Sequence, residues 1–462
     1  MISETPAGLP GNIAGLRALI ERNALTADEA LASQGEAFRK EPWHCAVAQF
    51  PLVSGRQGAG PLSGVGIAHK DLFRLPNRIP HCGAAHPWPE APARAASAMV
   101  RLARAGGQPL AALAMAEHAC GATAQNPHYP EVINPLDARA AVGGSSSGSG
   151  VAVAAGLCYG SLGTDTAGSV RIPAATCGVL GLKPTQGAVP VDGVAPLAPS
   201  LDSVGLLARG ADDAACLWRA LQSAKFSHDR PIFRDSGTPA ADDQWKLATC
   251  WIHGDSSMTA TDGFTQRTLD EFADECSARG SRRDRLLHDM PHWMRLAQTL
   301  LYAEAAVTHA LALRGAQPAL GALARAIALP GVALPVSWYL QAQEERSSHT
   351  RRFVADILAG VHLLLVPALP AGVPDKDEVS TVSPGFRPRR LLDLFCWMSF
   401  VNYLGLPAAV FPIAYDRNAR PICVQVIARP GDEAVLLAFA RQVELRRFDG
   451  QGFTRLSAHQ PF

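Results

Sequence analysis

The chain has 462 residues, of which 48% are hydrophobic, so it can bury a large core. Its 42 basic residues are balanced by 41 acidic ones, which leaves a net charge of +1 and no general attraction to nucleic acid or anionic lipid. No apolar stretch is long enough to cross a bilayer and no secretory signal opens the sequence, so we expect neither a membrane nor a nucleic acid as partner, and a cytoplasmic location.

Apolar periodicity predicts helices and strands that alternate along the chain. The first half predicts helices within 12–39, at 93–105 and at 151–157, and strands at 64–68, 109–115 and 159–164. The second half predicts helices at 211–222, 264–279, 292–313 and 432–447, and strands at 247–252, 363–367, 408–412 and 423–427. Two segments rich in Pro, Gly and Asp are predicted as loops, 226–245 and 367–390.

This alternation is typical of an α/β fold in which a sheet is covered by helices on both faces. No internal repeat or low-complexity segment marks a boundary, so 1–462 is predicted to be a single domain. The ten cysteines are scattered and form no CxxC pair. They are therefore expected to be reduced thiols in a cytoplasm, most of them packed as small hydrophobes.

The segment 143–150, Gly-Gly-Ser-Ser-Ser-Gly-Ser-Gly, is the most informative stretch of the chain. A glycine-rich turn before a helix directs backbone N–H groups at a ligand. A phosphate-binding loop would need a lysine that is missing here. The match of 144–148 to the GxSxG nucleophile elbow arises easily in a Gly/Ser run and lacks a clear preceding strand. A plain surface loop fits the composition of 143–150 but not the sequence that follows.

Residues 162–185, together with this loop, closely resemble the motifs of the amidase signature family. A third motif is present as Gly-Ile-Ala-His-Lys-Asp at 66–71, and the order and separation of the three match that family. The resemblance implies an amidase signature fold, a large mixed sheet covered by helices. It also implies a signature core at about 62–210, a substrate-shaping segment at about 226–390 and a return to the core at about 391–450.

The resemblance assigns the catalytic roles residue by residue. Ser169 is expected to be the nucleophile, Ser145 the bridging serine in a cis peptide, and Lys70 the base. The oxyanion hole is expected from the backbone N–H groups of Thr166, Ala167, Gly168 and Ser169. Supporting roles are expected for Ser146, Asp165 and Arg171, and positions in the substrate pocket for Met115 and Gly144.

The chemistry explains why a lysine is needed at position 70. Serine becomes a nucleophile only beside a base, and lysine is a base only when neutral. Lowering its pKa from about 10.4 to about 7–8 amounts to roughly 4 kcal/mol, which burial can supply. Arginine cannot be deprotonated. Only six of the 42 basic residues are lysine, so a lysine inside an apolar motif is a distinctive choice.

The expected reaction is hydrolysis of a carboxamide to a carboxylate and ammonia or an amine, through an acyl-enzyme on Ser169. A free-standing hydrolase of small aryl or acyl amides is the first reading. The alternative is the amidase subunit of a multi-protein enzyme, similar either to a glutamyl-tRNA amidotransferase or to an allophanate or biuret hydrolase. A catalytically silent binding protein is a third reading. Dimers are common in the family, so a homodimer is possible.

Some residues depart from the family pattern or suggest other chemistry. Ala167 replaces the usual glycine, which would narrow the pocket beside the oxyanion hole. Residues 111–114, Ala-Ala-Leu-Ala, replace a more polar family segment. The histidines form no competing triad, and His81, His86 and Cys82 lack a fourth ligand for a metal. We therefore expect no metal and no cofactor.

Overall fold

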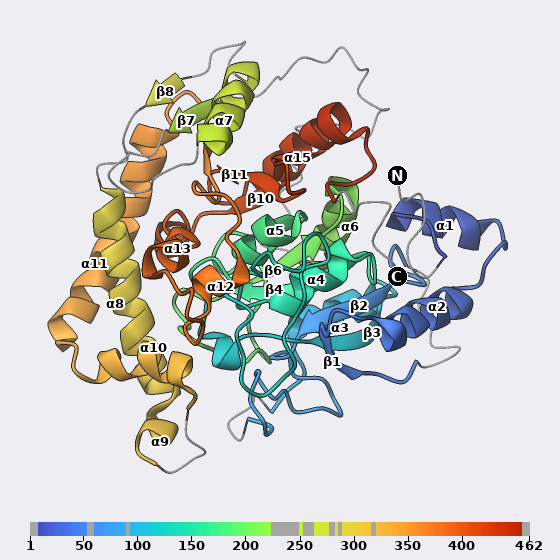
Figure 1. Ribbon diagram of the computed structural model, residues 1–462, viewed down its shortest axis with the longest axis horizontal. Coiled ribbons are helices and arrows are strands. Elements are labelled where there is room, and N and C mark those ends of the chain that lie inside the picture. The colour runs from blue at the N-terminus through green and yellow to red at the C-terminus, as the bar shows by residue number, and fades with distance from the viewer. Residues whose placement is uncertain are drawn as a thin grey trace.

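The computed structural model describes residues 8–52, 60–88, 93–222, 249–252, 263–276, 282–284, 289–315 and 320–454 (Figure 1). Its strands are β1 (Ala46–Gln49), β2 (Gly66–Lys70), β3 (Gln108–Leu113), β4 (Gly160–Asp165), β5 (Leu180–Lys183), β6 (Ser203–Ala208), β7 (Thr249–Ile252), β8 (Arg282–Asp284), β9 (Leu363–Pro367), β10 (Ala408–Tyr415) and β11 (Pro421–Ile427). Within the described residues they form one eleven-stranded sheet in the order β1-β3-β2-β4-β6-β5-β10-β11-β9-β7-β8.

The helices occur between these strands. They are α1 (Ile13–Glu21), α2 (Ala27–Lys40), α3 (Ser97–Arg104), α4 (Ser147–Ala154), α5 (Arg171–Cys177), α6 (Ala211–Leu221), α7 (Gly263–Cys276), α8 (Met290–Thr308), α9 (Ala310–Leu313), α10 (Ala322–Val332), α11 (Val336–Arg352), α12 (Lys376–Val379), α13 (Pro388–Asp393), α14 (Ser399–Tyr403) and α15 (Glu433–Phe448). A 3₁₀ turn, Glu117–Ala119, and a π turn, Phe353–Ile357, complete the set.

The sheet is mixed because it contains both parallel and antiparallel pairs. Strand β2 pairs in parallel with β3 and β4, and β7 pairs in parallel with β8 and β9. Strands β4, β6, β5, β10 and β11 pair antiparallel in turn, and β11 pairs antiparallel with β9. The sequence prediction of an α/β fold with a large mixed sheet is therefore confirmed.

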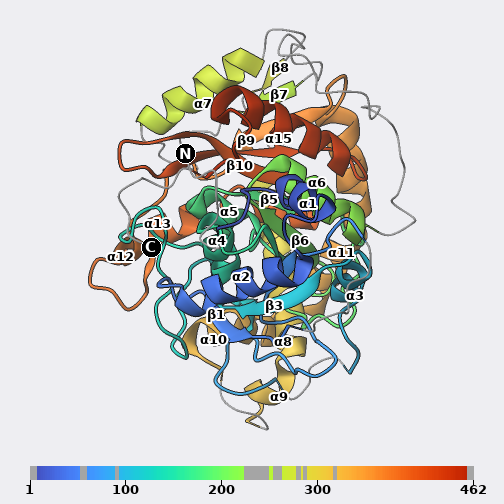
Figure 2. The ribbon, with the colours of Figure 1, turned by 90° about the vertical axis from the view of Figure 1, so that its right-hand side faces the viewer.

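Both faces of the central strands are covered, as the period-2 alternation of strand residues requires. In β11, Val424 and Val426 pack into the cluster that contains α6 and α15, while Cys423 packs into a different cluster with Ile172 of α5. Figure 2 shows α1, α6 and α15 on the side that faces the viewer. Helices α4 and α5 lie on the other face of the sheet. Each begins at the end of a loop in one of the signature motifs, 143–146 before α4 and 166–170 before α5.

Most predicted elements are present, with shifted ends. The helix predicted at 292–313 divides at His309 into α8 and α9, and the helix predicted at 151–157 begins four residues earlier, as α4. Elements without a sequence prediction include β1, β5, β6, α5, α10 and α11. The segment predicted as a loop at 367–390 contains α12 and the start of α13, and the loop predicted at 226–245 lies outside the described residues.

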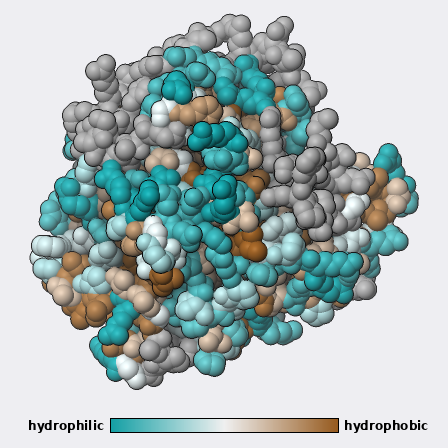
Figure 3. Space-filling view, in the orientation of Figure 1, coloured by the Kyte–Doolittle hydropathy of each residue, from teal (hydrophilic) through white to brown (hydrophobic). Residues whose placement is uncertain are grey.

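Among the described helices, none is by itself both long and apolar enough to span a bilayer. Helix α10 and the segment Val336–Ile357 satisfy that test only together, and they are bent by 94° at their junction. Several apolar side chains are exposed around this bend, including Val332, Val336 and Trp338. In Figure 3 apolar atoms gather at the lower left, where Figure 1 has α10 and the beginning of α11.

Candidate active site

The structure brings Lys70 and Ser145 into direct contact. Lys70 is the last residue of β2, and Lys70 Nζ donates hydrogen bonds to Ser145 Oγ at 2.7 Å and to Thr164 Oγ1 at 2.9 Å. Strands β2 and β4 are parallel neighbours with His69 opposite Leu162, which carries Thr164 to the side of the lysine. Lys70 and Ser145 are both 0% exposed. The two residues lie 75 positions apart in sequence, and the loop before α4 places Ser145 beside the end of β2.

Burial of Lys70 changes its acid–base chemistry. Desolvation lowers the pKa of its ammonium from 10.5 to about 7, against the attraction of the Asp202 and Asp165 carboxylates. The carboxylates are too far from Nζ to form an ion pair with it, and its hydrogen-bond partners in the described part of the chain are two neutral hydroxyls. A substantial fraction of Lys70 is therefore neutral at neutral pH and able to accept a proton.

Ser169 lies at the opposite end of this group, beside a cavity. It follows β4 by four residues and precedes α5 by two, and its side chain is among those that line the cavity. The backbone N–H of Ser146 donates to the Ser169 carbonyl oxygen at 3.2 Å, which fixes the Ser145–Ser146 backbone against the Ser169 loop. The peptide between Gly144 and Ser145 is cis, as the resemblance implies. Exposure thus falls from Ser169 at the cavity to Ser145 and Lys70 behind it.

The loop 166–169 offers backbone donors at this position. The N–H groups of Thr166, Ala167 and Ser169 make no hydrogen bond within the described part of the chain. Gly168 differs from this expectation because its N–H already donates to Asp165 Oδ1 at 2.9 Å. Gly168 instead supplies the turn, since its φ of +120° is one that side-chain-bearing residues rarely adopt and a Cβ there would meet Met398 Cβ at 2.8 Å.

A buried ion pair fixes the shape of this loop. Asp165 and Arg171 are both fully buried and meet at 2.8 Å, and Asp165 also accepts from the backbone N–H of Val170. Arg171 reaches across the core to Gln425 Oε1 and Asn402 Oδ1, both at 2.6 Å. Burial opposes ionisation of Asp165, but the Arg171 guanidinium holds its pKa well below the usual range. Both residues therefore support the loop and do not line the cavity.

The cavity in front of Ser169 has a volume of about 430 Å³. Its floor near Ser169 contains Gly144, Thr166 and Ala167, and its walls are mainly apolar side chains from α8, α10 and the segment after α13. The lining residues outside the floor are Ala119, Cys120, Gly121, Ala122, Ile172, Leu197, Leu201, Pro291, Met294, Arg295, Ala297, Gln298, Leu301, Tyr302, Ile327, Leu392, Phe395 and Ser399. Among the described residues that line it, Arg295 alone carries a charge, and it is exposed.

Of the two residues expected in the substrate pocket, one lines the cavity and the other does not. Gly144 lines the cavity, but Met115 does not: its side chain is 1% exposed and packs into the hydrophobic core. Met115 lies two residues after the end of β3, and its carbonyl oxygen accepts a hydrogen bond from the Asn126 side chain at 2.8 Å, which fixes it against the core.

Comparison with known proteins identifies the family and the fold. The Amidase family model matches residues 37–437. The putative amidase AmiD of Mycobacterium tuberculosis (strain ATCC 25618 / H37Rv) is 31% identical over 389 residues, covering 82% of this chain and 79% of that protein.

The chain belongs to the Amidase family.

Other members agree in fold over almost the whole length. The 1-carboxybiuret hydrolase subunit AtzE of Pseudomonas sp. (strain ADP) is 30% identical over 433 residues, covering 89% of this chain and 92% of that protein. A solved structure reported as a crystal structure of amidase superposes with a TM-score of 0.79 at 27% identity, covering 94% of this chain and 100% of that one. The family resemblance seen in the motifs is thus confirmed, and the protein is an amide-hydrolysing enzyme.

Several residues at the site had no role in the sequence analysis. Thr164 Oγ1 accepts a second hydrogen bond from the Lys70 ammonium. Asp202 accepts hydrogen bonds from Thr166 Oγ1 at 2.6 Å and from the backbone N–H of Leu197 at 2.9 Å. Burial raises the pKa of Asp202 to about 6, although these hydrogen bonds oppose the shift. Asn402 binds Asp165 from 237 positions away. No local pattern in the sequence indicates Asn402.

Proposed function

We propose that this enzyme hydrolyses neutral amides of apolar acyl groups through an acyl-enzyme on Ser169, with Ser145 and Lys70 as its proton relay. The observation that carries this proposal is the 2.7 Å bond between Lys70 Nζ and Ser145 Oγ. Both groups are fully buried, and the neighbouring serine, Ser169, faces an apolar cavity. A lysine held without a carboxylate partner is suited to accept a proton and not to hold a permanent charge.

In the proposed reaction Ser169 Oγ attacks the carbonyl carbon of the substrate. The Ser169 proton passes to Ser145, and the proton of Ser145 passes to the neutral amine of Lys70. The developing oxyanion is stabilised by the N–H groups of Thr166, Ala167 and Ser169, and each such donor is typically worth about 3–4 kcal/mol in the transition state. The relay then protonates the leaving nitrogen, the C–N bond breaks, and water hydrolyses the acyl-Ser169 ester in a second turn of the same relay.

The cavity favours an apolar acyl group. Its walls are built mainly from aliphatic and aromatic side chains, and Arg295 is its single charged residue in the described part of the chain. The name of the AtzE subunit indicates a carboxylated urea derivative as its substrate. In this cavity the carboxylate of such a substrate would lose its hydration, and the exposed Arg295 is the one charged group there that could compensate for that loss. We therefore place amides such as hexanamide or benzamide ahead of glutamine and of carboxylated ureas.

The nucleophile can be tested before the substrate is known. Purified enzyme is treated with a fluorophosphonate, its intact mass is measured, and the adduct is mapped on peptides. We expect one adduct, on Ser169, absent in Ser169→Ala and at least tenfold slower to form in Lys70→Ala. The matched control is Ser147→Ala, because Ser147 Oγ is buried nearby without a hydrogen-bond partner among the described residues. This variant should label at the wild-type rate.

An adduct on Ser146 would indicate that this serine is the nucleophile, in a nucleophile elbow, and would overturn the proposed relay. If labelling succeeds, ammonia release from hexanamide, benzamide, acetamide, glutamine and 1-carboxybiuret decides the substrate class. Turnover of the carboxylated urea or of glutamine alone would favour the subunit of a multi-protein enzyme over the free-standing amidase.

We also infer a reducing, cytoplasmic compartment. Seven of the nine cysteines whose side chains the structure describes are buried, and no two of the nine form a disulfide with each other, which agrees with thiols that stay reduced. The homodimer suggested by the family stays a prediction, for which sedimentation equilibrium of the purified chain is the direct measurement.

A further inference from the structure

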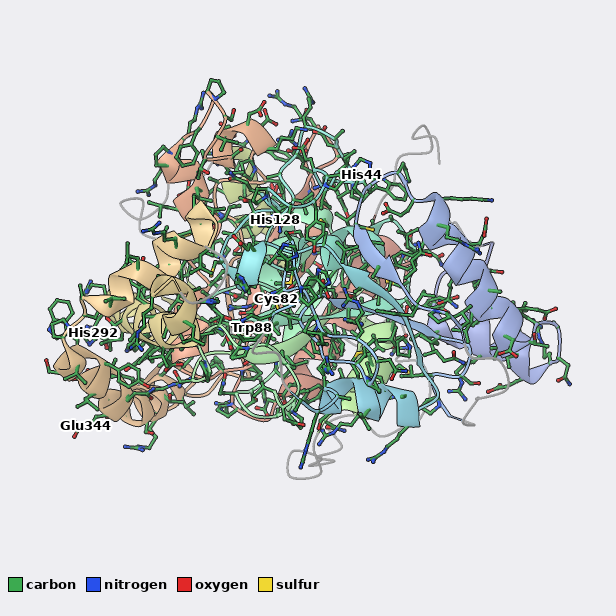
Figure 4. All side chains as sticks on the ribbon, turned by 90° about the horizontal axis from the view of Figure 1, so that it is seen from below. His44, Cys82, Trp88, His128, His292 and Glu344 are labelled. Carbon is green, nitrogen blue, oxygen red and sulfur yellow. The ribbon has the colours of Figure 1, made fainter. Side chains whose placement is uncertain are left out.

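Three side chains converge between α8 and α11, away from the cavity. His292 is the third residue of α8, and Glu345 and His349 lie one turn apart on α11, so they share one face of that helix. One ring nitrogen of each histidine and one carboxylate oxygen of the glutamate all lie within 4.8 Å of one another. In Figure 4 the label of His292 stands at the same edge of the molecule as that of Glu344, the neighbour of Glu345.

The distances between these atoms are too long for hydrogen bonds. His292 Nε2 is 3.6 Å and His349 Nε2 is 4.0 Å from Glu345 Oε2, whereas N–H···O bonds end near about 3.2 Å. A tetrahedral ion with bonds of about 2.0–2.2 Å holds neighbouring ligand atoms about 3.3–3.6 Å apart. The two distances to the carboxylate oxygen, 3.6 and 4.0 Å, are therefore close to the separation of ligands around an ion, and the third distance, between the two histidines, is at most 4.8 Å.

The ring of His349 is already oriented for this role. Its Nδ1 lies 3.1 Å from the Tyr403 hydroxyl, and that hydroxyl donates its own proton to the Ala342 carbonyl oxygen at 3.1 Å. The hydroxyl oxygen therefore accepts from Nδ1–H of His349, which leaves the lone pair on Nε2, the atom that faces Glu345. A hydrogen bond on the far ring nitrogen is the usual support of a metal-binding histidine.

The cluster is also open to an ion from solution. The side chains of His292 and Glu345 are 40% and 34% exposed, while that of His349 is 13% exposed. Two imidazoles and one carboxylate, with room for water as the fourth ligand, are a donor set that suits zinc and related ions. We propose that His292, Glu345 and His349 bind a divalent transition-metal ion of the zinc class, which fastens α8 to α11.

Such an ion would lie behind one wall of the cavity. Seven described residues of α8 line the cavity, and two of them, Pro291 and Met294, lie within two positions of His292. On α11, Arg346 follows Glu345 and donates to the carbonyl oxygens of Asn402 and Ser200. The ion would therefore hold α8, which forms one wall of the cavity, against α11, whose Arg346 binds the backbone of Asn402 beside the Asp165 loop. It would not contact the substrate.

The test uses the full chain without a purification tag, treated with EDTA and then titrated with ZnCl₂ by calorimetry. We expect one zinc ion to bind per chain and binding to weaken at least tenfold in His292→Ala and in Glu345→Gln. At a hundredfold excess of zinc over its Kd, the Tm of wild type should rise by at least about 2 °C. The matched control is His44→Ala, since His44 is exposed and lies far from His292 in Figure 4.

Cobalt supplies a readout that depends on the ligands themselves. Co²⁺ in place of zinc should give the visible absorption of a four-coordinate site in wild type and in His44→Ala, and should lose it in His292→Ala. Zinc binding of equal strength in wild type and His292→Ala would overturn the proposal and assign the metal to other groups. If no zinc binds at millimolar concentration, the proposal is wrong, and the cluster is an exposed ion pair that contributes little to the free energy of unfolding.

Discussion

Lys70 is suited to the proposed role of base because its surroundings lower its pKa and no described carboxylate forms an ion pair with it. Its two hydrogen-bond acceptors are hydroxyl groups, and burial alone brings its pKa to about 7. The second buried lysine, Lys183, has its pKa lowered to about 7 by the same cause, yet its ammonium donates to the Pro184 carbonyl oxygen and lies outside the cavity lining. Lys183 also donates to the Ser203 hydroxyl at 3.4 Å, but Ser203 does not line the cavity either. A lowered pKa therefore indicates a base only together with a hydroxyl group that adjoins the cavity.

We expect Lys70→Arg to lower kcat/KM about 10²–10⁴-fold, because a guanidinium cannot give up its proton to act as a base. The measurement is ammonia release from the best amide of the panel. Lys376→Arg is the matched control, since Lys376 forms an exposed pair with Glu131 on the surface and should leave turnover unchanged. Full activity of Lys70→Arg would exclude proton transfer to residue 70.

The pH dependence of turnover follows from the same residue. Only neutral Lys70 accepts the proton, so kcat/KM should rise with pH and level off above about 7. At pH 5 it should be about 100-fold lower than on the plateau, for a substrate that does not itself titrate. The profile is measured with circular dichroism at each pH to verify the fold, and a flat profile down to pH 5 would contradict a lysine base.

At the scale of an element, the Asp165–Arg171 pair joins β4, α5, α14 and β11 in one buried network. Removal of one partner leaves the other charge buried and unpaired, so Arg171→Met should lower the free energy of unfolding by about 3–5 kcal/mol. Chemical denaturation measures this loss. Arg139→Met is the control: its contact with Asp137 is 3.5 Å long and the arginine is 75% exposed, so its effect should stay below about 0.5 kcal/mol.

Helix α10 offers a test of the acyl cavity. Ile327 lines the cavity and Leu329, two residues later, is 49% exposed outside it. Ile327→Trp should lower kcat/KM for hexanamide at least about tenfold, because the larger ring occupies volume that the acyl chain needs, while acetamide changes little. Leu329→Trp should leave both substrates unaffected. Equal losses for hexanamide and acetamide in Ile327→Trp would place the acyl group elsewhere.

The sequence predicted the elements whose apolar periodicity is strong, and the family motifs placed Lys70, Ser145 and Ser169. Helix α11 had no such signal, because among its described residues only Ala342 is buried and most of its surface is polar. Helix α10 contains Pro330, which usually argues against a helix interior. The α8 wall and Asn402 depend on contacts over more than a hundred residues, which no local pattern encodes.

At the scale of the whole molecule, the signature core, residues 62–210, shares its sheet with strands from the C-terminal part of the chain. We therefore expect that it cannot fold by itself. Strand β5 pairs with β10, with Leu182 opposite Ala409, and Arg171 needs Asn402 and Gln425. We expect the fragment 62–210, expressed by itself, to show no cooperative thermal unfolding by circular dichroism, in contrast to the full chain. A cooperative transition of that fragment would contradict the single-domain prediction and divide the chain near residue 210.

The fall in exposure from Ser169 to Lys70 has a consequence for isotopes. Ser169 faces the cavity, through which solvent reaches it. The Lys70 amine behind it is fully buried, and among the described residues its hydrogen bonds go only to hydroxyl groups. Two hydrogens therefore move when the acyl-enzyme forms, one from Ser169 to Ser145 and one from Ser145 to Lys70. We expect kcat/KM to fall non-linearly as D₂O replaces H₂O in the buffer, and a linear fall would indicate that a single hydrogen moves in the transition state.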